Sequence, residues 1–143
     1  MLYKRSLNNL LRLFSEQKKA LNPIIPKDHE DTLFDKIVRK QIPANIVYED
    51  DLVLAFRDIS PQAPTHIVLI PKIRNGLINI SAAEERHKEI LGHLLIKAAE
   101  IAKKEKLDDG WRLVANNGVN ACQSVYHLHF HIIGGRPLGW PPG

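Results

Sequence analysis

The feature that most constrains this chain is the strict alternation of histidine with apolar residues in residues 126–135. His127, His129 and His131 are spaced two apart. Successive side chains of a β-strand point to opposite faces, so the pattern predicts a strand over residues 125–133 with three imidazoles on one face. The apolar residues of the other face would pack on a core: Leu128, Phe130 and Ile132. An imidazole can act near neutral pH as a nucleophile, an acid or base, or a phosphate hydrogen-bonder, so this face suits chemistry better than packing.

Composition limits the class of protein. A length of 143 residues with 44% hydrophobic residues indicates one globular domain with a real core. The net charge of +4 comes from residues 1–20, while the rest of the chain carries 15 basic and 15 acidic residues. A balanced body offers no broad basic surface, and no apolar run approaches the roughly 20 residues of a membrane span, so we expect neither nucleic acid nor membrane as a partner. The single cysteine, Cys122, rules out an internal disulfide framework.

Residues 1–28 read as an N-terminal extension, and residues 29–143 as the main domain. Large apolar residues recur in the extension at mostly helical spacing, which predicts a helix. They are Leu7, Leu10, Leu11, Phe14 and Leu21. A basic, amphipathic N-terminus also resembles a mitochondrial presequence. We favour a helix docked on the body and expect a cytoplasmic or nuclear protein, with the mitochondrion as the alternative.

The elements of the main domain follow the order helix, three strands, helix, two strands. A short helix capped at Asp31 and Thr32 ends before Pro43. Strands are predicted at 46–49, 52–57, 66–70, 111–115 and 125–133, the third of them central and buried. The capping box at 81–84 predicts the start of a long helix that runs to about residue 106. This order predicts an α+β domain with a five-stranded, mainly antiparallel sheet.

Three interpretations of the histidines compete. A polar strand face without function is the least favoured, because three histidines at strict spacing are unusual. A zinc site is possible in principle, but the outer histidines lie about 13 Å apart at about 3.3 Å per residue. All three therefore cannot bind one ion, and a zinc site would need His66 or a carboxylate as well. The third interpretation is phosphoryl or nucleotidyl transfer, with one imidazole attacking phosphorus.

The loop before the histidines favours transfer chemistry. Residues 116–124 are rich in small and amide residues, which can present N–H groups to an anion. Ser124 stands next to the histidine segment and is a candidate donor to a leaving atom. Alone, His66 is more often a buried core histidine and Asp58 a turn residue, although a carboxylate beside a nucleoside commonly binds the ribose hydroxyls.

These motifs resemble the histidine-triad (HIT) family, in particular its nucleotide-binding branch. The signature is residues 123–133, QSVYHLHFHII, and the resemblance extends to residues 31–43, 56–66 and the terminal WPPG at 140–143. It covers almost the whole body and leaves the N-terminal extension outside. The resemblance implies a HIT-like fold, a homodimer with joined sheets, and hydrolysis of purine nucleoside 5′-phosphoramidates. It implies no cofactor and no metal.

The resemblance also implies a division of labour among the catalytic residues. His129 would be the nucleophile and form a nucleotidyl-histidine intermediate. His131 would contact the phosphate, while His127 and His66 would support the imidazole network. Ser124 would hydrogen-bond the leaving group.

A second set of residues is implied for nucleotide binding, of AMP, GMP and their phosphoramidates. Asp58 would bind the ribose, with Ile59 and Phe56 near the base. Asn116 and Gln123 would lie along the phosphate. No magnesium is needed in this scheme, and the sequence offers no carboxylate cluster to hold one.

The C-terminal tail and the loop qualify the resemblance. Trp140 would reach the leaving-group side of the partner subunit, and the WPPG ending argues against the sister branch of dinucleoside polyphosphate hydrolases. The loop is often rich in glycine in this family, whereas here it carries Ala121 and Cys122, which would be strained at a positive φ. Arg57 stands at a variable position. A nucleotide-binding regulatory protein without turnover is the alternative from another class.

Overall fold

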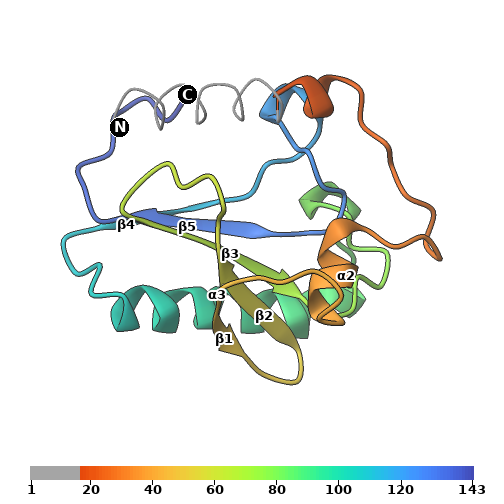
Figure 1. The fold of residues 1–143 in the computed structure, drawn as a ribbon, viewed down its shortest axis with the longest axis horizontal. Coiled ribbons are helices and arrows are strands. Elements are labelled where there is room, and N and C mark those ends of the chain that lie inside the picture. The colour runs from red at the N-terminus through yellow and green to blue at the C-terminus, as the bar shows by residue number, and fades with distance from the viewer. Residues whose placement is uncertain (1–16) are drawn as a thin grey trace.

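A single antiparallel sheet forms the centre of the protein in the computed structural model, which describes residues 17–143 (Figure 1). The strands are β1 (Ile46–Glu49), β2 (Val53–Arg57), β3 (Thr65–Pro71), β4 (Trp111–Val114) and β5 (Phe130–Gly134). Their order across the sheet is β1-β2-β3-β5-β4, and each neighbouring pair is antiparallel. The α+β class is confirmed, and β3 is central and buried along its length, as its apolar sequence predicts.

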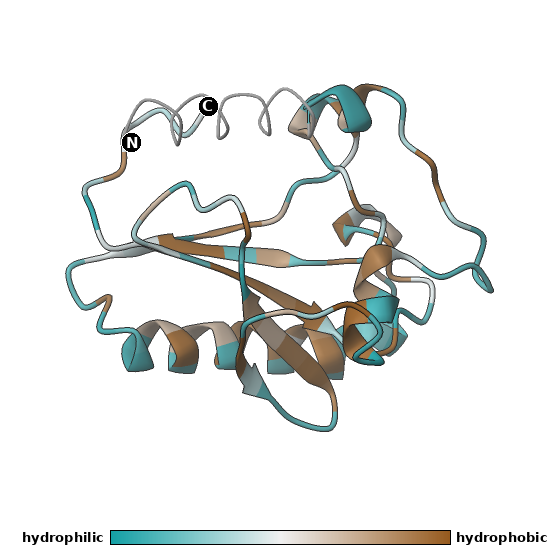
Figure 2. Cartoon of the chain, in the orientation of Figure 1, coloured by the Kyte–Doolittle hydropathy of each residue, from teal (hydrophilic) through white to brown (hydrophobic). Residues whose placement is uncertain are grey.

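One face of the sheet is covered by the long helix α3 (Lys88–Lys104), seen below the sheet in Figure 2. The neighbouring strands β2 and β3 contribute every second residue to this core: Val53, Ala55, Ile67 and Leu69. The helix contributes Leu94, Ala98, Ile101 and Ala102. The apolar residues of the histidine segment join the same cluster: Leu128, Phe130 and Ile132. The prediction that these three face the core is confirmed.

The other face holds the short helix α2 (Leu33–Val38). Phe34 and Ile37 pack there against the alternate residues of β2 and β3, which are Leu54, Phe56, Val68 and Ile70. Val68 is paired directly with His131 of β5, and residues directly opposite in an antiparallel pair share a face. The reactive side of the histidine segment therefore lies on the α2 face.

The start of the histidine strand differs from the prediction. Regular pairing begins at Phe130, and residues 125–129 run outside the sheet ladder. The reason is a competing partner: the Leu128 N–H donates to the carbonyl of Leu77, in the segment after β3, at 2.9 Å. Alternation of side chains thus persists in a segment that is not part of the sheet.

The start of the long helix is also corrected. The predicted capping box at 81–84 does not open α3, which begins at Lys88 after two 3₁₀ turns, Ile80–Ala82 and Glu85–His87. Ser81 is used across the chain instead. Its N–H donates to Asn117 Oδ1 at 2.9 Å, and its hydroxyl accepts from Asn117 Nδ2 at 2.9 Å. The serine therefore holds the loop of residues 116–124 rather than capping a helix.

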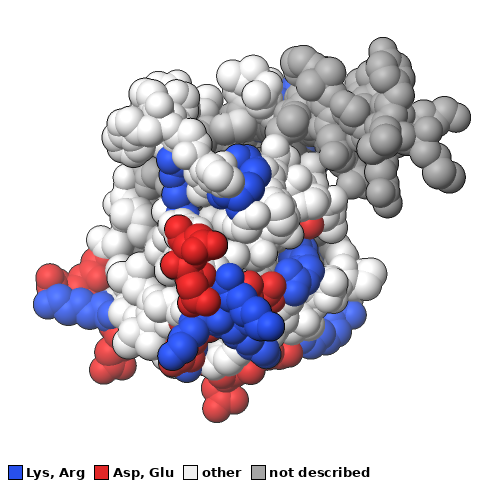
Figure 3. Space-filling model, turned by 90° about the vertical axis from the view of Figure 1, so that its left-hand side faces the viewer, with Lys and Arg blue, Asp and Glu red and all other residues white. Residues whose placement is uncertain are grey.

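The extension is described only from residue 17, where residues 17–21 are helical and Ala20 is buried. The apolar positions predicted in residues 1–16 lie outside the described residues. No helix in residues 17–143 is long and apolar enough to span a membrane. On the face shown in Figure 3, basic and acidic side chains are interspersed rather than gathered in one basic patch.

Candidate active site

The three histidines of the signature and His66 meet on the α2 face of the sheet. His131 belongs to β5 and His66 to the neighbouring β3, whereas His127 and His129 precede β5. The ring centroids of His129 and His131 are 5.1 Å apart, as are those of His66 and His131. The cluster is largely buried, with His127 at 0% exposed. Hydrogen bonds to the backbone and between two of the rings fix the proton positions on the imidazoles.

His129 is held with one nitrogen free. Its Nδ1 lies 2.8 Å from the backbone carbonyl of His127. A carbonyl oxygen only accepts, so the proton resides on Nδ1 and Nε2 keeps its lone pair. Burial lowers the pKa of His129, and the hydrogen bond to the His127 carbonyl only partly opposes that lowering. The ring is therefore neutral near pH 7, which is the state that a nitrogen nucleophile requires.

His66 and His131 form a second chain of hydrogen bonds. The Gln62 backbone N–H donates to His66 Nδ1 at 3.1 Å, so the proton of neutral His66 is on Nε2. That nitrogen lies 2.9 Å from His131 Nδ1, which accepts. The remaining proton of His131 is then on Nε2. Burial, with the nearby His129 and His66, lowers the pKa of His131 to about 3. His131 thus offers a neutral N–H donor next to His129.

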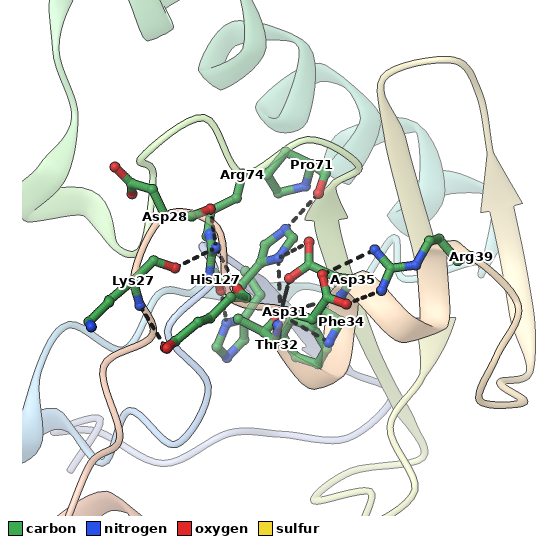
Figure 4. Close-up of polar contacts among 12 residues, drawn as sticks. Lys27, Asp28, Asp31, Thr32, Phe34, Asp35, Arg39, Pro71, Arg74 and His127 are labelled. Carbon is green, nitrogen blue, oxygen red and sulfur yellow. Dashed lines mark hydrogen bonds and ion pairs between the residues drawn. The ribbon is translucent and has the colours of Figure 1, made fainter.

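Both ring nitrogens of His127 contact groups of β3 and of the start of α2. Its Nε2 donates to the carbonyl of Pro71, at the end of β3, at 2.7 Å. Its Nδ1 lies 3.3 Å from the hydroxyl of Thr32 (Figure 4). Burial lowers the pKa of His127 as well. These contacts bind His127 to β3 and α2, and its supporting role in the reaction stays a prediction.

Asp58 lies beside His66 at the end of β2. Its Oδ2 is 3.5 Å from His66 Nε2, and its Oδ1 accepts the Ser60 N–H at 2.7 Å. Burial lowers the pKa of His66, and the Asp58 carboxylate opposes that change. Ile59 is exposed, whereas Phe56 is buried in the core against Phe34. The structure therefore brings Asp58 to the histidine cluster and leaves Phe56 beneath the surface.

The loop of residues 116–124 is held by Gln123, which is 1% exposed. Its Oε1 accepts from Gly118 N–H at 2.9 Å and from Asn79 at 3.3 Å. Its Nε2 donates to the carbonyls of Ile78 and Val125 at 2.9 and 3.2 Å. The Gln123 amide is fully used in holding the loop to residues 78–79 and to Val125, so this placement does not support its expected contact with phosphate.

Backbone strain in this loop falls at Cys122. Its φ is 61° and ψ is 35°, the left-handed region. The expectation that a non-glycine residue would be strained here is confirmed at Cys122. The neighbouring candidates, Asn116 and Ser124, are half-buried. Trp140 is 84% exposed on this chain.

Three of these groups come close enough to hold a metal ion. One ligand atom each from Asp58, His66 and His131 lies within 4.8 Å of the others. Among the described residues, this group includes neither His127 nor His129. Imidazole and carboxylate are ligands that suit zinc, and a fourth position would be open to water or substrate.

Several supporting groups were not predicted. The rings of His127 and His129 both pack edge-on against Phe34, with centroids 5.8 and 5.0 Å away. Thr32 was predicted only as a helix cap, and the Gln62 N–H and the Pro71 carbonyl are backbone groups without a sequence signal. Their contacts depend on tertiary structure, since Thr32 and His127 are 95 residues apart.

Comparison with known proteins gives consistent matches. Residues 39–138 match the family model described as the HIT domain. The chain is 57% identical over 129 residues to a 14 kDa zinc-binding protein of Zea mays, covering 90% of this chain and 98% of that protein. It is 55% identical over 131 residues to adenylylsulfatase HINT1 of Arabidopsis thaliana, covering 92% and 88%. A solved HIT family hydrolase from Legionella pneumophila superposes with a TM-score of 0.75 at 46% identity, covering 79% of this chain and 100% of that chain.

Proposed function

The chain belongs to the HIT domain family as a nucleotide hydrolase, and we propose that it hydrolyses purine nucleoside 5′-phosphoramidates. The observation that carries this proposal is the free Nε2 of His129. The ring is neutral, oriented through Nδ1, and adjacent to the donor Nε2–H of His131. A phosphorus atom in front of His129 would meet a nucleophile and a hydrogen-bond donor together.

The reaction would proceed in two steps. His129 Nε2 attacks the α-phosphorus, the P–N bond breaks, and the amine leaves with a proton drawn from solvent. The Ser124 hydroxyl hydrogen-bonds the leaving nitrogen, and His131 Nε2–H donates to a phosphoryl oxygen. Water then attacks the nucleotidyl-histidine, releasing the nucleoside monophosphate and restoring His129. Positioning and fixed donors would supply most of the rate enhancement.

The nucleotide would be held along the end of β2. Asp58 Oδ2 is near His66 and, among residues 17–143, accepts from no backbone N–H, so it can accept from ribose hydroxyls. Ile59 is exposed beside it and would contact the purine, with Phe56 behind, and Asn116 would approach the phosphate. In the proposed homodimer, the exposed Trp140 would come from the partner subunit to the leaving-group side.

The leaving group is open to a direct test. A relative is named an adenylylsulfatase, and adenylyl sulfate carries the same adenylyl phosphorus with a leaving group that needs no proton. A panel of adenosine and guanosine phosphoramidates, adenylyl sulfate and a diadenosine polyphosphate would rank them by kcat/KM. We expect the phosphoramidates to lead. A faster reaction with adenylyl sulfate or the polyphosphate would replace the proposed substrate class.

The proposed nucleophile is tested by His129→Asn. Turnover should fall by about 10³-fold or more, because no nitrogen lone pair faces phosphorus, while AMP binding by calorimetry persists. The wild-type rate in this variant would refute the assignment. Wild type that binds AMP but turns over no member of the panel would favour a regulatory binding protein.

A zinc-binding role is the second candidate. Relatives of Zea mays and Brassica juncea are named 14 kDa zinc-binding proteins, and Asp58, His66 and His131 bring ligand atoms within 4.8 Å. An ion there would occupy groups needed for the nucleotide, so zinc should compete with AMP. Activity retained after chelation, with metal content measured on the same sample, would reject a metal-dependent reaction.

A further inference from the structure

The first turn of α2 approaches the catalytic histidines from behind. Thr32 caps this helix: its hydroxyl accepts from the N–H groups of Phe34 and Asp35 at 3.2 and 3.3 Å. Asp35 completes a capping box, because its Oδ2 accepts from the Thr32 N–H at 2.7 Å and lies 2.8 Å from the Thr32 hydroxyl. Capping thus accounts for one oxygen of the Asp35 carboxylate.

The other oxygen of the Asp35 carboxylate faces His127. Asp35 Oδ1 lies 3.7 Å from His127 Nδ1, inside the group of contacts drawn in Figure 4. A carboxylate beside a fully buried imidazole is not required for a helix cap. It raises the pKa of His127 against the stronger lowering caused by burial. The charge of Asp35 therefore acts on His127 in addition to its capping role.

The Thr32 hydroxyl links the two residues. It has one proton and two acceptors, Asp35 Oδ2 at 2.8 Å and His127 Nδ1 at 3.3 Å. Turned toward His127, the proton satisfies a neutral ring. Turned toward Asp35, it leaves Nδ1 without a donor, because the oxygen already accepts from the N–H groups of Phe34 and Asp35. In both arrangements the ring is held between Thr32 and the Pro71 carbonyl.

The position of His127 sets that of the nucleophile. The carbonyl that accepts from His129 Nδ1 is the backbone carbonyl of His127 itself, at 2.8 Å. Phe34, in the same first turn, packs against both rings. A shift of His127 would therefore move the acceptor that aims His129, and small misplacements of reacting groups are costly in rate.

We propose that Asp35 is a positioning residue for His129, acting through Thr32 and His127. The inference rests on the proposed function for the identity of the nucleophile. It goes beyond that function in giving α2 a part in the reaction. Asp35 touches neither substrate nor the reacting atoms, so its contribution should appear in kcat and in the state of the His127 ring.

Arg74 fixes the chain that leads into this turn. Arg74 is 7% exposed, and its Nη2 donates to the carbonyls of Lys27, Asp28 and Glu30 at 3.2, 3.0 and 2.8 Å. Burial raises the pKa of Asp35, but the hydrogen bonds from Thr32 and the Arg74 charge oppose it, and the net pKa is lowered. The Asp35 carboxylate is therefore anchored and ionised near pH 7.

The test compares Asp35→Asn and Asp35→Ala with Asp31→Asn. Asp31 is the matched control, because it is a carboxylate at the same helix start that pairs with Arg39 on the surface and does not contact His127. Asparagine at position 35 keeps an acceptor for the Thr32 N–H but loses the charge. We expect kcat to fall on the order of 10-fold with KM unchanged, more in the alanine variant, and not in Asp31→Asn.

A second readout is independent of substrate. Nitrogen-15 NMR of the imidazoles should show a lower pKa for His127 in Asp35→Asn, and a faster-exchanging Nδ1 proton of His129. Wild-type kcat in both Asp35 variants, or an equal loss in Asp31→Asn, would overturn the positioning role. If wild type turns over no phosphoramidate, the proposed function fails. In that case unchanged His129 resonances would still overturn the inference, and altered ones would support it.

Discussion

The four histidines divide into two pairs that are held by different means. His66 and His131, the strand pair, sit on neighbouring strands whose backbone ladder fixes their separation. His127 and His129, the segment pair, lie outside the ladder and are held by α2, by the end of β3 and by each other. The strand pair inherits its geometry from the sheet. The segment pair depends on a few side chains, so single substitutions should affect it more.

The largest difference in rate tests what each pair contributes. His129→Asn removes the nucleophile, whereas His131→Asn removes one donor to the phosphate. We expect a loss of about 10²-fold in kcat for His131→Asn, the usual cost of one preorganised donor, against about 10³-fold or more for His129→Asn. Single-turnover kinetics with a fluorogenic phosphoramidate would measure both. Equal losses would mean that the two rings act as one unit.

The strand pair was the more predictable of the two. Period-two alternation placed Leu128, Phe130 and Ile132 in the core and the histidines opposite, and β3 was identified as central from its apolar run. The predicted strand at residues 125–133 is wrong at the segment pair, because the Leu128 N–H donates to the carbonyl of Leu77 instead of a neighbouring strand. No local pattern encodes that bond, nor the contact of Thr32 with His127. The helix cap predicted at Thr32 is confirmed. The cap predicted at Ser81 is wrong, because Ser81 hydrogen-bonds to Asn117 of the loop instead.

Acid sensitivity should also differ between the pairs. Burial and both neighbouring histidines lower the pKa of His131 from 6.5 to about 3, whereas Asp35 and the Pro71 carbonyl oppose the lowering at His127. Unfolding lets each ring take up a proton below its ordinary pKa, so stability is full above about pH 6.5 and falls as the pH drops toward 3.

The measurement is urea unfolding at pH 7.5 and pH 5. One such ring contributes about 1.4 kcal/mol of lost stability per pH unit inside its window. His131→Asn should remove more of the acid-induced loss than His127→Asn does. A larger relief from His127→Asn would contradict the different electrostatic surroundings of the two rings.

Two buried threonines allow the stabilisation of the segment pair by side chains to be compared with the stabilisation of the strand pair by backbone hydrogen bonds. Thr32→Val removes the hydroxyl that caps α2 and contacts His127, and should lower the free energy of unfolding by about 1–2 kcal/mol. Thr65, which begins β3, is equally buried, and its hydroxyl makes no hydrogen bond to any of residues 17–143. Thr65→Val should therefore leave the free energy of unfolding unchanged. Thr32→Ser keeps the hydroxyl and should retain most of the stability that Thr32→Val loses. A destabilised Thr65→Val would show that the ladder is as sensitive as the segment.

The smallest effect is expected where the loop that leads into the segment pair is strained. Cys122 adopts φ 61°, a conformation that costs an L-residue about 1 kcal/mol or more. Cys122→Gly should relieve this strain, while the greater freedom of glycine in the unfolded chain opposes the gain. We expect the free energy of unfolding, measured by thermal unfolding, to rise by about 0.5 kcal/mol. Cys122→Ser keeps the side-chain size and the strain, so it should leave stability unchanged. A gain from the serine variant would trace the effect to the thiol instead. A lower stability of the glycine variant would mean that restricting the backbone of this loop stabilises the protein by more than the strain at Cys122 costs.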